Sequence, residues 1–206
     1  ASTDSFDIEI RGKGGHAAMP DTVIDPVLVA GHLSTAVQSI IARNITSTSS
    51  GVISITRMHA GSAYNVIPEF AHLHGTIRTL DETQRQLIKQ RFQQLVENTA
   101  AAFGATATLT FIPGYPATIN DAVKADICRE VTAGLVGMEN VQWNPPPSMG
   151  AEDFAYMLQQ RPGAYIWIGN GDMTESRGLH NPHYDFNDNI LPLGASNWVK
   201  LVQRLC

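Results

Sequence analysis

FDIEIRGKGGHAAMP, residues 6–20, joins an alternating segment to a glycine-rich turn. In FDIEIR, residues 6–11, apolar and charged side chains alternate strictly, and a period of two residues is typical of a strand with one buried face. Asp25 and Pro26 follow the turn, and a capping residue before a proline predicts the start of a helix. Apolar residues then recur at helical spacing as far as about Asn44. The stretch therefore predicts a strand, a loop and a helix, in that order.

The segments that follow complete the same folding unit. VISITRM, residues 52–58, and FAHLHGTIRT, residues 70–79, are predicted strands separated by a turn. A capped helix is expected next, and ATATLTFI, residues 105–112, alternates again. The order strand-helix-strand-strand-helix-strand is that of the ferredoxin-like fold, in which two helices cover one face of a four-stranded antiparallel sheet. We assign residues 5–113 to this domain.

Residues 114–206 have a different character. Helices are predicted at about 120–136, 151–160 and 193–205, with one apolar strand, AYIWIG, at 164–169. One strand cannot form a sheet, and an unbroken apolar run is typical of a strand buried on both faces of a larger α/β sheet. We therefore expect residues 114–206 to be the C-terminal part of an α/β domain whose other strands come from elsewhere.

The composition excludes several classes of protein. The chain has 206 residues and a formal net charge of −5, which gives no basic footprint for a nucleic acid. Its apolar runs are far shorter than the ~20 residues that a membrane span needs. Cys128 and Cys206 are distant in sequence, so we expect free thiols in a reducing, cytoplasmic compartment. The chain starts with Ala1 rather than Met, and we expect its natural N-terminus to be missing.

The glycine-rich turn carries the first candidate catalytic residue. Gly12, Gly14 and Ala17 fit a dinucleotide-binding fingerprint, but Pro20 separates the turn from the helix, which argues against that alternative. A loop that needs the conformational freedom of glycine explains the glycines. It does not explain His16, which is held among them.

Two histidines in GLHNPHYDF, residues 178–186, are candidate metal ligands. His180 lies in irregular backbone between a predicted strand and a helix, where an imidazole can line a cleft. The alternative is a surface histidine, which spacing alone favours. His183 is a weaker candidate, because two histidines separated by Asn-Pro on non-helical backbone do not naturally converge on one ion.

Three further polar residues are candidates for binding a substrate. Arg78 can bind a carboxylate with two hydrogen bonds, and the amide of Asn65 can orient a carbonyl or stabilise an oxyanion. Glu152 stands in MGAEDF, residues 149–154, where the residues alone favour capping of a helix as the explanation of an acid. Taken singly, each of these two residues favours the simpler interpretation, in which Asn65 is a turn asparagine and Arg78 a surface arginine. The chain has no G-x-S-x-G elbow, P-loop or H-E-x-x-H motif.

Taken together, these segments resemble the M20-type metallopeptidases, and within them the amidohydrolase branch of hippurate hydrolases, N-acyl-amino-acid hydrolases and auxin-conjugate hydrolases. The motifs occur in the order and spacing of that family, and they span almost the whole chain: RGKGGHAAMP (11–20), YNVIP (64–68), GTIRTL (75–80), MGAEDF (149–154) and HNPHYDFNDNILPLGA (180–195).

The resemblance implies a fold, a cofactor and a partner. It implies that residues 5–113 are a lid domain, which commonly mediates dimerisation, and that residues 114–206 belong to a zinc-exopeptidase-type catalytic domain. That domain would hold two divalent metal ions (Zn, Mn, Co or Ni) in the full-length enzyme. A homodimer formed through the lid is expected, with an N-acyl amino acid as substrate.

The resemblance also implies roles for the candidate residues. His180 matches the last metal ligand, and His16 matches a histidine that approaches the substrate carbonyl, often from the neighbouring subunit. Asn65 and Arg78 match lid residues that contact the substrate, and Glu152 matches a position near the site. The implied reaction is metal-dependent hydrolysis of the amide bond of N-acyl amino acids.

The sequence also departs from the family pattern. The segment that carries the other metal ligands and the general-base glutamate is absent, so we expect this chain alone to bind metal weakly and to be inactive. Asp21 follows Ala18-Met19-Pro20, where the family often has a histidine. Residues 46–50 replace the loop that usually follows the first helix. The alternatives are an M20 dipeptidase or aminoacylase, and a non-catalytic ferredoxin-like module for dimerisation or binding.

Overall fold

The computed structural model describes residues 1–171 and 178–206. The chain divides into two compact units. Unit 1 comprises Ala1–Thr118 and Pro147–Tyr156, and unit 2 comprises Ile119–Pro146 and Met157–Cys206. The boundaries predicted above, 5–113 and 114–206, remain a prediction about domain limits, because compactness alone does not assign a domain.

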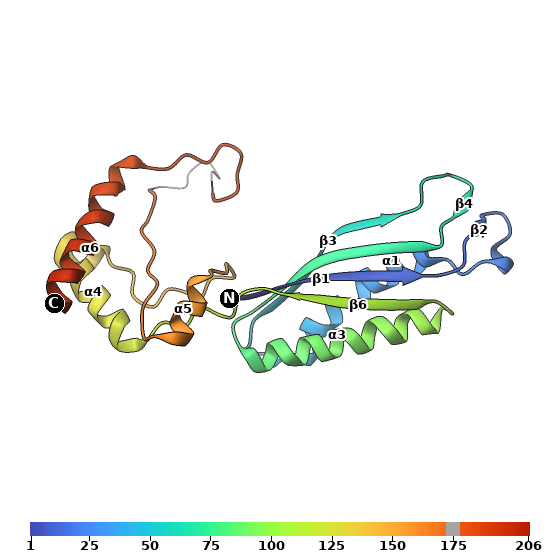
Figure 1. The fold of residues 1–206 in the computed structure, drawn as a ribbon, viewed down its shortest axis with the longest axis horizontal. Helices are drawn as coiled ribbons and strands as arrows, with labels where there is room; N and C mark the ends of the chain where they lie inside the picture. Colours follow the sequence, from blue (N-terminus) through green and yellow to red (C-terminus); the bar gives the residue numbers. More distant parts are fainter. Residues whose placement is uncertain (172–177) are drawn as a thin grey trace. The chain divides into compact units, whose positions relative to one another are not determined.

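Unit 1 is built on a four-stranded antiparallel sheet (Figure 1). The strands lie in the order β3-β5-β1-β6, which is the ferredoxin-like order, and this confirms the predicted fold class. The bounds of its main elements are β1 (Ser2–Arg11), α1 (Pro26–Ala36), α2 (Gln38–Asn44), β3 (Gly51–Ala60), β5 (Phe70–Thr79), α3 (Glu82–Ala102) and β6 (Thr106–Pro113).

The first helical segment differs from its prediction. The sequence predicts one helix as far as Asn44, and the structure has α1 and α2 separated at Val37. The N–H of Ile40 bonds the carbonyl oxygen of Val37, three residues back, so the turn is locally tightened. Asp25 caps α1 as predicted, because its carboxylate accepts hydrogen bonds from the N–H groups of Val27 and Leu28.

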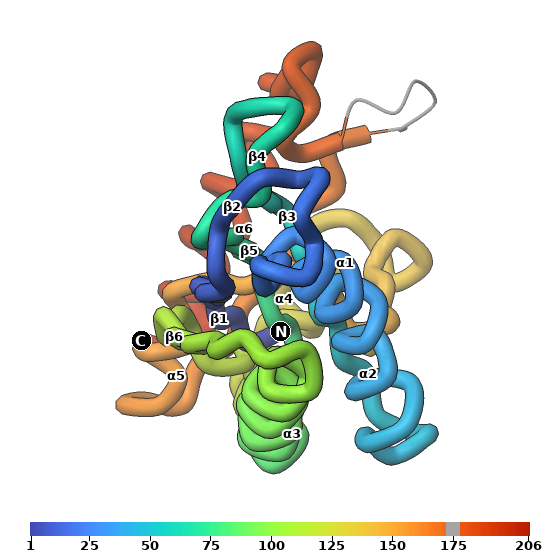
Figure 2. The backbone as a smooth tube through the Cα atoms, turned by 90° about the vertical axis from the view of Figure 1, so that its right-hand side faces the viewer, coloured from blue at the N-terminus to red at the C-terminus, as the bar shows by residue number. Residues whose placement is uncertain are grey.

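One face of the sheet holds the core of unit 1. Phe6, Ile8 and Ile10 of β1 are buried, as the alternation of FDIEIR predicts. The ring of Phe6 meets that of Phe92 of α3 edge-to-face, with centroids 4.8 Å apart. The helices lie on this face, and the other face of the sheet has no helix of unit 1 over it (Figures 1 and 2).

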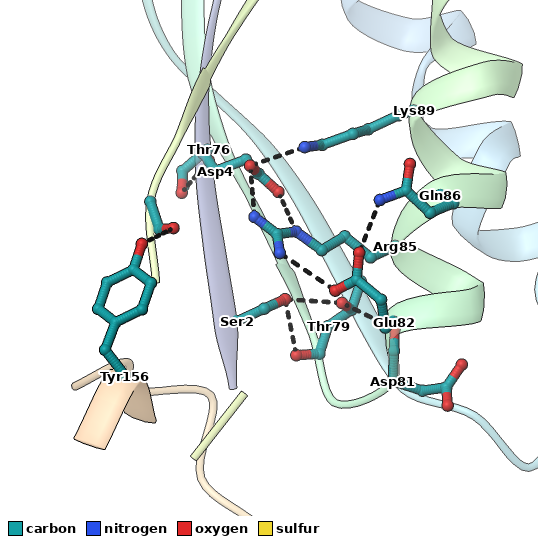
Figure 3. Close-up of polar contacts among 11 residues, drawn as sticks. Ser2, Asp4, Thr76, Thr79, Asp81, Glu82, Arg85, Gln86, Lys89 and Tyr156 are labelled. Atoms are coloured by element: carbon teal, nitrogen blue, oxygen red, sulfur yellow. Dashed lines mark hydrogen bonds and ion pairs between the residues drawn. The ribbon is translucent and has the colours of Figure 1, made fainter. Parts of the chain in front are cut away.

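A buried ion pair joins β1 to α3 (Figure 3). The carboxylate of Asp4 accepts hydrogen bonds from Nε (2.6 Å) and Nη2 (2.8 Å) of Arg85 and from Nζ of Lys89 (2.8 Å). Burial alone would raise the pKa of Asp4, but its bonds to these two cations outweigh that effect and hold the pKa below its usual value. Asp4 is therefore charged and paired inside unit 1.

Unit 2 contains α4 (Ala122–Val136), η2 (Met138–Asn140), η3 (Asp188–Ile190) and α6 (Leu191–Leu205). Helices α4 and α6 pack together, and the hydroxyl of Thr132 donates to Oδ1 of Asn197 at 3.0 Å. The helix α5 (Phe154–Gln160) spans the boundary between the units and begins three residues later than predicted. Among the described residues, no helix is both long and apolar enough to cross a membrane.

The predicted strand at residues 164–169 is wrong for this structure. The segment has no strand partner among the described residues, and Asn120 brackets Tyr165 with two hydrogen bonds instead. Ile166, Trp167 and Ile168 are exposed. A strand needs a neighbour to accept and donate its backbone hydrogen bonds, so this apolar run of high strand propensity forms no strand here.

Candidate functional site

Two loops meet at the end of the unit 1 sheet that is remote from Ala1 (Figure 1). A two-stranded ribbon joins them, formed by β2 (Gly15–His16) and β4 (Val66–Ile67). The N–H of Gly12 bonds the carbonyl of Glu69 at 2.9 Å, and Lys13 pairs with Ile24. We call residues 14–20 and 61–68 together the tip.

Close approach of backbone, rather than an unusual dihedral angle, explains Gly12 and Gly14 of the turn before His16. A Cβ on Gly12 would lie 2.1 Å from the carbonyl oxygen of Ile24, and one on Gly14 would lie 2.9 Å from that of Ile67. Neither glycine has a positive φ. The sequence led us to expect that these positions need the conformational freedom of glycine. The structure instead needs glycine there because it has no side chain.

His16 is held at the tip in a defined tautomer. Its Nδ1 accepts a hydrogen bond of 3.1 Å from the N–H of Ala18, so the proton of the neutral imidazole resides on Nε2. The side chain is exposed. The imidazole thus presents an N–H donor to whatever approaches the tip, and a donor of this kind can stabilise a developing oxyanion.

Asn65 lies beside His16 at the tip. Its backbone carbonyl accepts a hydrogen bond of 3.0 Å from the N–H of Ala17, and Val66, the next residue, is paired with His16 in the ribbon. The sequence singled out both His16 and Asn65, and the structure brings them together. Tyr64, immediately before Asn65, is fully exposed, and no sequence pattern marked it as a site residue.

Arg78 lies at the opposite end of the sheet from His16. It pairs with Thr3 and with Val52, while Phe70, at the start of the same strand, lies at the tip end beside Arg11. Arg78 follows Phe70 by eight positions along β5, which corresponds to a length of about 26 Å along the strand. The structure therefore does not bring Arg78 and His16 to one small-molecule site within a single chain.

Arg78 and Glu152 share one end of unit 1. The amino nitrogen of Ala1 donates to the carbonyls of Ser148 (3.1 Å) and Gly150 (2.6 Å), which holds MGAEDF against the start of β1. Burial and the charge of Arg78 lower the pKa of this amino group, and Glu152 acts in the opposite sense. Arg78 and Glu152 are thus both close enough to Ala1 to act on its charge.

His180 lies in unit 2 with an unusual backbone conformation. Its φ is +69°, in the left-handed region that residues other than glycine seldom adopt. Such strain concentrates at functional sites, so the angle favours a role for His180 beyond that of a surface histidine. Nearby, the N–H of His183 bonds Oδ1 of Asn181 at 2.8 Å, which fixes a local turn.

The described residues do not form a metal centre by themselves. Within residues 1–171 and 178–206, no three His, Cys, Asp or Glu side chains are placed to hold an ion. Catalytic metal sites use about three protein ligands plus water. His180 alone does not fit such a site, and further ligands would have to come from outside the described chain.

The open face of the sheet carries two histidines of β5. His72 and His74 of β5 lie there, and Nδ1 of His74 is 2.5 Å from Oδ1 of Asp7. The side chains of His74 and Asp7 are partly exposed. Their pairing is a cross-strand contact on a polar face, and it accounts for His74 without a catalytic role.

Comparison with known proteins then identifies the family. The model of peptidase family M20/M25/M40 matches residues 9–204, which is nearly all of the chain. The chain belongs to this family.

Several curated M20 relatives and solved structures cover the whole chain. It is 36% identical over 201 residues to the N-acetylcysteine deacetylase of Bacillus subtilis, covering 98% of this chain and 51% of the relative. It is 34% identical over 204 residues to the hippurate hydrolase of Campylobacter jejuni, covering 99% and 52%. A Bacillus subtilis structure described as a dinuclear metal binding peptidase from the M20 family matches with a TM-score of 0.75 and 28% identity, covering 100% of this chain and 50% of that one. The chain spans about half the length of these relatives.

Proposed function

We propose that a longer protein containing this chain hydrolyses the amide bond of N-acyl amino acids in a metal-dependent reaction. Membership of the M20 family supports hydrolysis. The names of the relatives, a hippurate hydrolase and an N-acetylcysteine deacetylase, support the N-acyl amino acid class. The two free cysteines of the described chain support a cytoplasmic location, which we also propose.

The separation of His16 from Arg78 carries the structural part of the proposal. By resemblance to the family both residues would face the substrate, yet they belong to opposite ends of the sheet, and the strand from Phe70 at the tip end to Arg78 alone spans about 26 Å. An N-acyl amino acid is far shorter than that. Both residues can serve one substrate if they come from two chains, so we propose a homodimer formed through unit 1 in which the tip of one chain completes the site of the other.

Each candidate residue then has a chemical task. Arg78 binds the free carboxylate of the amino-acid part, which fixes the register of the substrate. The Nε2–H of His16 from the second chain donates to the carbonyl oxygen as it becomes an oxyanion. Asn65 keeps the tip in place through its bond to Ala17, and Glu152 lies at the same end of the sheet as Arg78.

His180 is proposed as one metal ligand of the longer protein. One relative of known structure is described as a dinuclear metal binding peptidase. This chain supplies no set of three ligands among its described residues, so the remaining ligands would come from the half of the relatives' length that it does not span. His180→Ala in the longer protein should lower its metal content as measured by mass spectrometry.

The test of the proposal is steady-state hydrolysis of N-benzoylglycine by the longer protein. Arg78→Ala should raise KM for N-benzoylglycine much more than for the uncharged N-benzoylglycinamide, because only the first offers a carboxylate. His16→Ala should mainly lower kcat, by about 100-fold if the lost donor acts in the transition state. The 206-residue chain alone should show no hydrolysis. Equal losses on both substrates for Arg78→Ala would refute its assignment to the carboxylate.

A further inference from the structure

The tip that carries His16 has an unusual surface for an exposed loop pair. Its two segments, residues 14–20 and 61–68, contain no Asp, Glu, Lys or Arg, although such residues make up 16% of the chain. Charged residues stand immediately outside them: Lys13 and Asp21 flank the first segment, and Glu69 follows the second. The lack of charge is therefore confined to the tip itself.

Apolar side chains take the place of charged ones at the tip. Tyr64 is fully exposed, Met19 is 55% exposed and Val66 is 50% exposed. Single exposed apolar residues are ordinary, but three on the two short loops that hold one candidate catalytic histidine indicate a contact surface. The backbone of all three residues lies close to His16. Val66 pairs with His16 in the ribbon, and the N–H of Met19 donates to the carbonyl oxygen of His16 at 2.9 Å. Tyr64 precedes Asn65, whose carbonyl oxygen accepts from the N–H of Ala17.

The tip is also held in place before anything binds. The bond from Ala17 to Asn65 ties the two loops together, and the close approach of Gly14 to the carbonyl oxygen of Ile67 leaves no room for a side chain between them. Tyr64, Met19 and Val66 are therefore presented in a fixed relation to His16. Little ordering of backbone would be needed on binding, and a surface of this kind binds selectively at low entropic cost.

We infer that the tip binds the acyl group of the substrate, with Tyr64 as the main contact. The tip favours bulky apolar or aromatic acyl groups over acetyl. This inference rests on the proposed function. The acyl substituent is bonded directly to the carbonyl carbon that His16 addresses, whereas the carboxylate lies beyond the amide nitrogen and the α-carbon. The tip offers no Lys or Arg to a carboxylate, whose binding is the proposed task of Arg78 at the other end of the sheet.

The division of tasks has a physical advantage. An apolar tip that closes on the acyl group expels water from around the scissile carbonyl. In that drier environment the hydrogen bond from Nε2 of His16 to the oxyanion is stronger than it would be in water. A charged tip would have to be desolvated at a cost on each closure, so the lack of charged residues there fits this use.

The experiment compares two substrates that differ only in the acyl group, N-benzoylglycine and N-acetylglycine, with the longer protein and its Tyr64→Ala variant. We expect kcat/KM for the benzoyl substrate to fall about tenfold and that for the acetyl substrate to change by less than about twofold. Tyr64→Phe should keep the benzoyl preference, because the ring remains. Met138→Ala is the matched control, since Met138 is 58% exposed in unit 2 and should change neither value.

Several outcomes would overturn the inference. An equal change on both substrates, or none on either, would remove Tyr64 from acyl recognition. A weakened dimer in analytical ultracentrifugation with an unchanged benzoyl preference would show that the tip contacts a protein partner instead. If the unaltered protein hydrolyses neither substrate, the proposed function fails, and that result is distinct from a failure of the acyl assignment. Because Tyr64 is fully exposed, its substitution should leave the melting temperature unchanged.

Discussion

The two units of this chain differ in how completely they bury their apolar side chains. Unit 1 has a contiguous core between its sheet and helices, with Phe6 and Phe92 at its centre. In unit 2, only Asn197 and Leu201 are buried among the described residues. Trp198 is 71% exposed and Trp167 is 61% exposed. Unit 1 therefore has a hydrophobic core of its own, whereas unit 2 exposes apolar surfaces that suit contact with further protein.

The largest effect is expected in the core of unit 1. Phe92→Ala removes a fully buried ring from its edge-to-face contact with Phe6, and it should lower the free energy of unfolding by about 4 kcal/mol. Urea denaturation of this chain, followed by circular dichroism, measures the change. A loss below about 1 kcal/mol would contradict a tightly packed core in unit 1.

A slightly smaller effect, with a pH signature, is expected at the buried ion pair. Asp4→Asn leaves Arg85 and Lys89 without their shared carboxylate and should cost about 3 kcal/mol near pH 7. The folded-state pKa of Asp4 lies below its unfolded value of about 3.9, so this contribution is present above that pH and is lost as the pH falls further.

Denaturation at several pH values checks the sign of this linkage. The stability difference between the unaltered chain and Asp4→Asn should be constant from pH 6 to 7 and should shrink below about pH 4. Glu9→Gln, on the open face of the sheet, is the control because its side chain is exposed. A difference that grows on acidification would contradict the charged, paired state of Asp4.

At the contact between α4 and α6 we expect a loss of about 1 kcal/mol in the free energy of unfolding. Thr132→Val removes the donor to Oδ1 of Asn197 and keeps the shape of the side chain. The matched change in unit 1 is Thr79→Val, which removes a buried contact of 2.8 Å with Oγ of Ser2. Thermal unfolding of both variants measures the two losses. If Thr132→Val were the more costly change by several kcal/mol, unit 2 would be better packed than its burial indicates.

The smallest effect is expected on the exposed side of α6. Trp198→Ala should change the stability of this chain by less than about 0.5 kcal/mol, because the ring contributes little buried area here. In the longer protein the same substitution should cost about 3 kcal/mol, if that surface is covered. Equal and small losses in both proteins would show that Trp198 faces solvent in each.

The fold of unit 1 was predictable because its determinants are local. Alternation in residues 6–11 and the cap at Asp25 act over a few neighbours, and they specify strand and helix without reference to the rest of the chain. The strand at residues 164–169 failed because pairing requires a distant partner, which no local pattern reports. The break at Val37 was likewise not visible, because the apolar spacing of the sequence continues through it and Val37 itself is buried.

The candidate site was predictable in part for the same reason. The sequence marked His16, Asn65, Arg78, Glu152 and His180 singly, and the structure joins His16 with Asn65 and groups Arg78 with Glu152. The separation of these two groups follows from strand direction and register, which the motifs do not encode. Tyr64 escaped notice because exposure is a property of the fold, although the absence of charged residues in the tip was readable beforehand.

Mixing two impaired variants of the longer protein tests whether one site is formed by residues of two chains. His16→Ala and Arg78→Ala subunits are each impaired, but a mixed dimer contains one site with both residues intact. If subunits exchange freely, half of the dimers are mixed and half of their sites are intact, so about a quarter of the unaltered activity on N-benzoylglycine should return. Activity that stays at the sum of the two variants, with subunit exchange verified by native mass spectrometry, would contradict a site shared between chains.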